Sequence, residues 1–224
     1  MSNFPSKNSV IKAVLTGIEV AKKNYFFWTN DRLFLSYGPR KIITIHVAQE
    51  LGKIPEKPEV FIDATVADIL RCSLPTRSEY SSYMQENNLK QGAVSITLDE
   101  RFTHENDNDS ISKVIISIKN GVRNAKQEYT KEIERLCKML YPKNPSMSTL
   151  DYAIFAFYAD LTEGARKKLA TRIPQITKSF DKVVSTFPNL EASFQSLGVN
   201  RILEAGEWCA GAYIISPKAN PSGR

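Results

Sequence analysis

A chain of 224 residues, 42% hydrophobic and 24% charged, is long enough for one medium-sized domain, and its composition excludes a collagen-like, low-complexity or disordered protein. The formal net charge of +6 favours polyanionic partners through counterion release without requiring them. The N-terminus lacks a signal-peptide pattern and no segment reaches the roughly 18 apolar residues of a membrane span, so we expect a cytoplasmic protein with no membrane partner.

The first predicted element is a helix over residues 8–24, because apolar residues recur there at a spacing of three or four and Asn8 or Ser9 can cap its start. Two short apolar runs follow, YFFWT at 25–29 and LFLSY at 33–37. They predict an extended or hairpin-like pair of segments. We interpret the aromatic residues of the first run as core packing rather than as a surface that stacks nucleic-acid bases.

A second helix is predicted from Arg40 to Leu51, between a Gly-Pro break and a closing glycine. A strand over residues 59–65 (EVFIDAT) follows it and leads into a helical turn. The polar stretch 73–90 is expected to be a loop with one helical turn. The apolar face of the second helix is expected to consist of Ile42, Ile45, Ala48 and Leu51.

An antiparallel hairpin is predicted in the middle of the chain. Residues 91–98 (QGAVSITL) alternate apolar and polar side chains, as a half-buried strand does. A polar turn cluster follows, and residues 113–118 (KVIISI) form the second strand. Lys119 comes at the end of that strand, and Asn120 and Gly121 are expected to form the turn into the next helix.

Two further helices and two strands are predicted in the second half. The helices cover 124–140 and a long segment from 165 to 187, which Pro174 should kink or divide. The strands cover 151–161, the most hydrophobic of the chain, and 207–216. We expect a single domain over residues 1–216 and a flexible tail over 217–224; within the domain the N-terminal helix covers 8–24, the core roughly 38–169, and the C-terminal helix and strand 163–216.

This order of helix, strand, two-stranded hairpin, helix, strand and helix resembles the core of the PD-(D/E)XK nuclease superfamily, the restriction-endonuclease-like fold. The resemblance is carried by the segments GAVSITL, VIISIKNGV and EYTKEIERLCKML, with support from RKIITIHVAQEL, VFIDATV and DYAIFAFYADLT. It covers roughly residues 38–169. It implies an α/β protein with a mixed central sheet flanked by helices, to which an extra C-terminal helix and strand are added.

In that family, two carboxylates on adjacent strands hold Mg²⁺, and a lysine lies beside the attacking water or the phosphate. Carried over to this sequence, the first acid falls on Ser95, the second on Ser117 and the lysine on Lys119. Both carboxylates are therefore replaced by neutral side chains, and no metal or cofactor is expected. Asp63 is a candidate for a surviving acid, although its position favours a helix cap.

Relocated carboxylates would restore a Mg²⁺ or Mn²⁺ site. Asp99 and Glu100 follow the first hairpin strand, and Glu50 lies on the second helix. Asp99 comes four residues after Ser95, about 13 Å along an extended strand, which is too far to replace the missing acid without a bulge.

The leading hypothesis is a catalytically degenerate nuclease-fold protein that binds nucleic acid, DNA foremost, or a partner protein, in defence against foreign DNA as relatives of this fold often act. The alternatives are an active metal-dependent DNA nuclease with relocated carboxylates and a structural or regulatory subunit of a larger assembly, a homodimer included. The nucleic-acid-binding face is expected to consist of Arg40, Lys41, Lys119, Arg123 and Lys126.

The remaining reactive residue types point to no chemistry of their own. His46 and His104 are far apart in sequence, which favours neither a nucleophile–base pair nor a zinc site. Cys72, Cys137 and Cys209 match no metal-ligand spacing and predict reduced thiols, with Cys137 as a packing residue.

Overall fold

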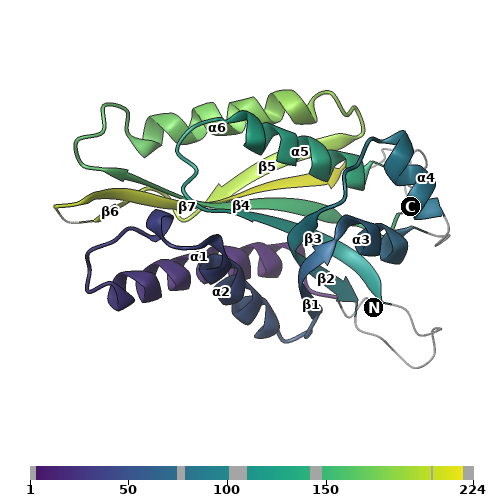
Figure 1. Cartoon of the computed structure of the whole chain (residues 1–224), viewed down its shortest axis with the longest axis horizontal. Helices are drawn as coiled ribbons and strands as arrows, with labels where there is room; N and C mark the ends of the chain where they lie inside the picture. The colour runs from purple at the N-terminus through teal and green to yellow at the C-terminus, as the bar shows by residue number, and fades with distance from the viewer. Residues whose placement is uncertain (1–3, 75–78, 101–109, 142–147, 203, 219–224) are drawn as a thin grey trace.

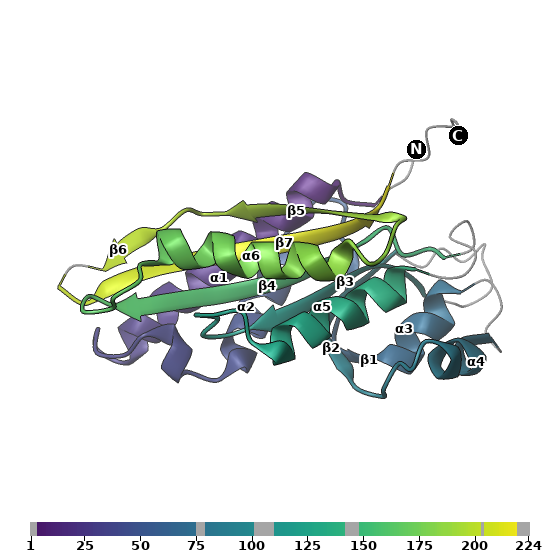
Figure 2. The same ribbon diagram turned by 90° about the horizontal axis from the view of Figure 1, so that it is seen from above.

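The computed structural model describes residues 4–74, 79–100, 110–141, 148–202 and 204–218. Within them the protein is α/β, with a mixed, open seven-stranded sheet between two layers of helices (Figures 1 and 2). The helices are α1 Lys7–Trp28, η1 Leu35–Tyr37 (a 3-10 helix), α2 Arg40–Gly52, α3 Val66–Ser73, α4 Glu79–Glu86, α5 Gln127–Leu140 and α6 Leu169–Val184. The strands are β1 Glu59–Thr65, β2 Ala93–Glu100, β3 Ile111–Lys119, β4 Tyr152–Thr162, β5 Leu190–Ser196, β6 Asn200–Ile202 and β7 Gly206–Pro217.

The strands lie in the order β1-β2-β3-β4-β7-β5, with β6 paired to β7. The predicted β2–β3 hairpin is antiparallel, and β3 and β4 form a parallel pair joined by α5. β7 is inserted between β4 and β5 and is antiparallel to both. Because α5 connects two parallel strands, it runs back across the sheet, and its first turn lies near the ends of β3 and β4.

Each face of the sheet supports its own hydrophobic core. Val114, Ile116 and Ile118 of β3 pack with α1 and α2, whereas Ile115 lies in the core that α3, α5 and α6 cover on the other face (Figure 1). β4 is buried on both faces from Tyr152 to Leu161. This double burial explains why it is the most hydrophobic strand in the sequence.

Helices α1 and α2 pack at very short range. A Cβ atom built on Gly17 of α1 would lie 2.5 Å from the Cα of Val47 on α2, closer than any side chain permits. Glycine at this position is therefore a requirement of the helix pair. α1 is capped by Ser6, whose hydroxyl accepts from the Ser9 backbone N–H, rather than by Asn8 or Ser9 as expected.

The YFFWT segment is helical, so the prediction of an extended pair is wrong. α1 continues to Trp28 and ends where Asn30 and Asp31 both adopt positive φ angles. The expectation of core packing is also wrong for the last two aromatic residues, because Phe27 is 77% exposed and Trp28 is 59% exposed. The helix ends at local polar residues that tolerate the left-handed conformation. These residues lie further along the chain than the basic residues at 22–23, where the sequence predicted the helix to end.

The apolar face of α2 is rotated by one residue from the predicted one. Ile45 is 44% exposed, whereas Ile43, Val47 and Leu51 are buried against α1 and the sheet. His46 is also buried, and it contacts Asn24 and Gln49, so its role is structural. Aliphatic residues occur on both sides of this helix, so periodicity alone does not select the buried side.

The strands β5 and β6 and the 3-10 helix η1 have no counterpart in the sequence prediction, and α4 is longer than the one helical turn expected between residues 73 and 90. β5 and β6 precede the last strand. β5 is an edge strand whose residues after Leu190 are largely exposed, so it lacks the alternation of a half-buried strand. α6 is shorter than expected and contains Pro174 near its start.

Other expectations concern the cysteines and the membrane. All three cysteines are outside disulfides, and burial raises the pKa of Cys137 to about 12 and that of Cys209 to about 11. Among the helices of the described residues, none has the length and hydropathy needed to cross a bilayer. His104 and most of the 217–224 tail lie outside the described residues.

Candidate nucleic-acid interface

Ser95 lies at the point where β2 leaves β3. The ladder between these strands begins at the pair Ile96 and Ile116, and the buried Ser95 comes just before it. Its Oγ accepts a hydrogen bond of 3.0 Å from the backbone N–H of Ile118. The hydroxyl thus replaces the carbonyl acceptor that a longer β2–β3 ladder would provide. Its oxygen is therefore already engaged in a hydrogen bond that belongs to the fold.

Ser117 is buried on the α5 side of β3. Its Oγ donates to Oε1 of Glu132 at 2.5 Å, and Nη2 of Arg135 donates to the same oxygen at 2.6 Å. Arg135 also donates to the carbonyl of Ala93, at 3.2 Å. This charge-assisted cluster fastens α5 to the hairpin and neutralises the one carboxylate that contacts Ser117.

Lys119 ends β3 and is partly buried, with no hydrogen bond or ion pair to any described residue. The next residue fixes its position, because Nδ2 of Asn120 donates to the carbonyls of Leu35 at 2.8 Å and Gly38 at 2.9 Å. Gly121 then adopts a φ angle of +70°, which glycine tolerates best. The end of β3 is therefore held against the start of α2, and Lys119 is left without an internal partner.

Asp63 takes neither role proposed for it. Its carboxylate forms an ion pair with Lys41 of α2, on the opposite face of the sheet from the Ser117 cluster. The cap of α3 is Thr65, whose hydroxyl accepts from the backbone N–H of Asp68 at 3.1 Å. The helix begins at Val66, directly after the strand as the sequence predicted, but its cap is Thr65, so Asp63 as a helix cap is wrong.

The donors at the hairpin do not suit a divalent cation. Mg²⁺ and Mn²⁺ require several oxygen ligands, usually anionic, whereas both serines are neutral and Glu132 is paired with Arg135. Two of the carboxylates that could have formed a relocated metal site are engaged elsewhere. Glu50 pairs with Lys53, and Asp99 of β2 accepts a hydrogen bond from Ser110, the residue just before β3. Within the described residues, no group of three or more His, Cys, Asp or Glu side chains is placed to hold a metal.

Arg123 is committed to a buried carboxylate. Asp160, fully buried at the end of β4, accepts from Nε of Arg123 at 3.1 Å and from Nη2 at 2.6 Å. Ser36 donates to the same Asp160 oxygen at 3.0 Å and accepts from Arg123 at 2.9 Å. The cluster joins β4, η1 and the β3–α5 connection, so Arg123 stabilises the fold.

The other predicted basic residues divide into two groups. Lys41 pairs with Asp63, and Lys126 lies 3.8 Å from a carboxylate oxygen of Glu128. Arg40, by contrast, is exposed at the first turn of α2, and its side chain has no hydrogen bond or ion pair to the described residues, as is also true of Lys119.

Helix α6 brings further cations that sequence reasoning missed. Arg172 donates to the carbonyl of Arg123 at 3.2 Å and to Oδ1 of Asn124 at 2.6 Å, which places the start of α6 beside the β3–α5 connection. The exposed run Arg166-Lys167-Lys168 comes just before it. The sequence does contain a signal for these cations, because this run of three basic residues follows shortly after the most hydrophobic strand. We call the following residues the cationic edge: Arg40, Lys119, Lys126, Arg166, Lys167, Lys168 and Arg172.

Three helices begin at the cationic edge. The residues that precede the first turns of α2, α5 and α6 are Pro39, Lys126 and Lys168, and none of them caps its helix with a side chain. The N-terminal turn of a helix carries partial positive charge and unsatisfied N–H groups. In α6 the Leu169 N–H is taken by Glu207, whereas α2 has no acidic residue in its first turn. In α5, Glu128 lies in the first turn. Of these three starts, that of α2 is therefore the one without a carboxylate, and it adds to the positive field of the side chains.

No family model, no curated protein and no solved structure matches this chain. The α/β class and the mixed sheet follow from the strand pairing itself. Function has to be inferred from how charge and hydrogen bonding are distributed over the described residues.

Proposed function

We propose that this protein binds nucleic acid, DNA foremost, along the cationic edge, on a restriction-endonuclease-like fold whose metal-binding carboxylates have been lost. The observation that carries the proposal is a division of roles at the end of the hairpin. The hydroxyls of Ser95 and Ser117 form internal hydrogen bonds, whereas Lys119 has no internal partner among the described residues. The site thus contains the lysine of the proposed nuclease-like arrangement, but serines stand where its metal-binding carboxylates would be.

The arrangement of elements supports the nuclease-like part of the proposal. The observed order α2, β1, α3, α4, β2, β3, α5, β4, α6 contains the helix, strand, hairpin, helix, strand, helix order of the resemblance, with α3 and α4 inserted between β1 and the hairpin. The hairpin strands are adjacent and antiparallel, and the strand after α5 pairs with β3. Ser95 and Ser117 lie on these adjacent strands, as the family's acids do.

The charge distribution supports nucleic acid as the ligand. Arginine and lysine side chains and uncapped helix starts are the groups that contact phosphate oxygens. The carboxylate of Asp160 lies at the same end of the sheet but is buried and occupied by Arg123 and Ser36, so it does not oppose an approaching backbone. Such contacts position a polyanion without distinguishing its bases, so we expect weak sequence preference.

Fluorescence anisotropy with a labelled duplex and a labelled single strand tests the proposal. We expect binding at low salt, with log K falling linearly against log salt at a slope of about −0.9 per phosphate contact on duplex DNA. Incubation with Mg²⁺ or Mn²⁺ should leave the DNA intact. Divalent-dependent cleavage that Lys119→Ala abolishes would instead establish an active nuclease.

A triple variant, Arg40→Ala with Lys119→Ala and Lys167→Ala, removes three cations from three elements of the cationic edge. We expect the salt slope to fall by about three, because each phosphate contact contributes about one. The matched control is Lys182→Ala, an exposed cation in the last turn of the same α6 and about 20 Å from its start. Absence of binding to any nucleic acid at low salt would refute the proposal and favour a partner protein.

A further inference from the structure

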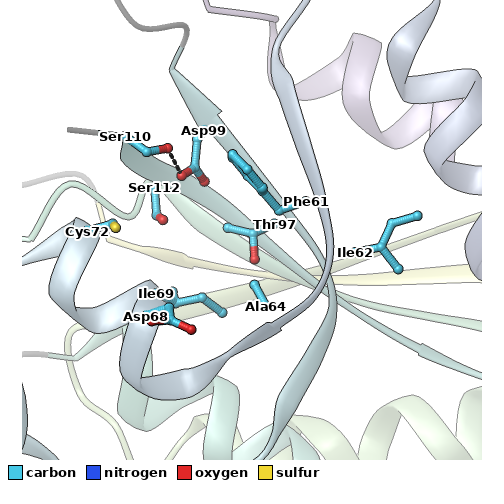
Figure 3. Close-up of a pocket in the computed structure, with 10 residues that line it drawn as sticks. All are labelled: Phe61, Ile62, Ala64, Asp68, Ile69, Cys72, Thr97, Asp99, Ser110 and Ser112. Carbon is cyan, nitrogen blue, oxygen red and sulfur yellow. Dashed lines mark hydrogen bonds between the residues drawn. The ribbon is translucent and has the colours of Figure 1, made fainter. Parts of the chain in front are cut away.

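A second site lies at the other end of the β2–β3 hairpin and depends on no part of the proposed function. A cavity of about 280 Å³ opens between the sheet edge and α3 (Figure 3). It is close to the lower end of the size range of small-molecule pockets, which begins at about 300 Å³. The residues around it are Phe61, Ile62, Ala64, Asp68, Ile69, Cys72, Thr97, Asp99, Ser110 and Ser112.

The cavity walls are mostly apolar. Phe61 and Ala64 of β1 face it from one side and Ile69 of α3 from another, whereas the side chain of Ile62 points away from the group (Figure 3). Phe61 is 44% exposed, so its ring forms part of the rim and remains accessible to solvent. A flat apolar body of ring size would contact these walls.

Two buried polar atoms of the lining residues have no hydrogen-bond partner among the described residues. Asp99 is only 3% exposed; Ser110 donates to its Oδ2 and the Ser112 hydroxyl lies nearby, but Oδ1 has no hydrogen bond to the described residues. Thr97 is 1% exposed, and its Oγ1 is likewise unpaired within them. Buried polar atoms without partners are rare in native proteins, because each costs its desolvation without a compensating bond.

The charge of the lining is negative. Two carboxylates belong to it: Asp99 is buried, whereas Asp68 is exposed and accepts from Arg71 and Thr65. None of the described residues that line the cavity is basic. Burial, with a smaller contribution from Glu59 on β1, raises the pKa of Asp99, as expected for a carboxyl group that no cation of the described residues compensates.

We propose that this cavity binds a small organic cation, an amine or amidine carried on a flat apolar body. Its N–H groups would donate to Oδ1 of Asp99 and Oγ1 of Thr97, and its apolar part would lie between Phe61 and Ile69. The ring of Phe61 adds an aromatic face of the kind that attracts cations. A neutral apolar ligand would leave both oxygens without donors, and an anion would meet the buried Asp99 carboxylate.

Benzamidine is a suitable probe, because neutral benzamide has nearly the same shape and serves as its control. Isothermal calorimetry and amide NMR shifts on the whole protein should show millimolar or tighter binding of benzamidine, with resonances of Phe61, Ile69 and Thr97 perturbed. Benzamide should bind at least tenfold more weakly. Asp99→Asn should lose at least tenfold in benzamidine affinity, while Asp31→Asn, which neutralises an exposed aspartate on another loop, should bind normally.

Asp99→Asn preserves the shape of the side chain, and its thermal unfolding verifies that the variant is folded. Thr97→Val supplies a second, isosteric test and should also weaken binding. Equal affinity for benzamidine and benzamide would overturn the proposal, as would full binding by folded Asp99→Asn. Absence of binding by benzamidine and by phenethylamine at millimolar concentration would overturn it as well.

Discussion

Two buried aspartates of this protein differ in how their carboxylates are compensated. Asp160 accepts hydrogen bonds from Arg123 and Ser36 at the cationic end of the sheet. Asp99, in the cavity beyond the opposite end of the hairpin, has two serine hydroxyls nearby and one oxygen without a partner. A carboxylate with a full set of donors holds elements together, whereas one that lacks donors destabilises the fold unless a ligand supplies them.

The largest expected effect comes from removing the compensated carboxylate. Asp160→Ala leaves the Arg123 guanidinium without its ion-pair partner and cuts the link between β4 and η1. We expect a loss of about 3–5 kcal/mol in the free energy of unfolding, the usual cost of breaking a buried pair. Urea denaturation measures it, with Glu191→Ala, which removes an exposed carboxylate on the edge strand β5, as the control. A loss below about 1 kcal/mol would mean that the two aspartates are equivalent.

A smaller loss is expected when Ser117 is replaced by the acid that the proposed nuclease-like fold would carry at that position. In Ser117→Asp, a second carboxylate would lie within contact of Glu132, and like charges at that range raise the pKa of both. We expect a destabilisation of about 2 kcal/mol at pH 7, shrinking as the pH falls and the pair takes up a proton. Ser117→Ala, which removes only the hydrogen bond, should lose about 1 kcal/mol. If Mn²⁺ restored the thermal stability of Ser117→Asp, the metal site would be recoverable.

For Asp99, whose carboxylate lacks a full set of donors, substitution is expected to raise the free energy of unfolding rather than lower it. The pKa of Asp99 is raised above its ordinary value of 3.8, so folding favours the protonated form and the ionised form penalises the native state at neutral pH. Asp99→Asn should therefore stabilise the protein by about 1 kcal/mol at pH 7. The advantage should vanish as the pH falls below 3.8, where the wild-type carboxyl is protonated in both states. Destabilisation at pH 7 would show that Asp99 is a structural residue like Asp160.

The smallest effect on stability is expected for a cation without internal partners. Arg40→Ala should change the free energy of unfolding by less than about 0.5 kcal/mol, as exposed substitutions usually do. Its DNA affinity should still fall measurably at low salt. Arg123→Ala provides the contrast, because it should unfold at a clearly lower temperature through the loss of its bonds to Asp160.

Much of the fold was predictable from the sequence, because most core elements have strong local patterns. α2, β1, the hairpin, α5 and β4 agree with their predicted positions within a few residues. The failures have a common cause in tertiary context. Periodicity did not indicate that Ile45 lies on the solvent side of α2, and the exposed edge strand β5 has no apolar alternation.

The candidate site was predictable only in part. The resemblance assigned the family's acids to Ser95 and Ser117, which stays a prediction. It did not reveal their hydrogen-bond partners, Ile118 for Ser95 and Glu132 for Ser117. Those partners come from another element or from the backbone of the neighbouring strand, so no local pattern marks them. Arg123 was likewise expected to face the ligand because its partner, Asp160, is 37 residues away.

The insertion of β7 between β4 and β5 affects how the chain can fold as it is synthesised. β5 pairs with β7 alone, and α1 packs on β7, where Nζ of Lys7 donates to Oγ of Ser216 at 3.0 Å. Until residue 217 has left the ribosome, the central strand β4 has an open edge and α1 has an incomplete surface to pack on. Such contacts between distant segments predict slow folding with a high contact order, and nascent chains stopped before β7 should require chaperones to remain in solution.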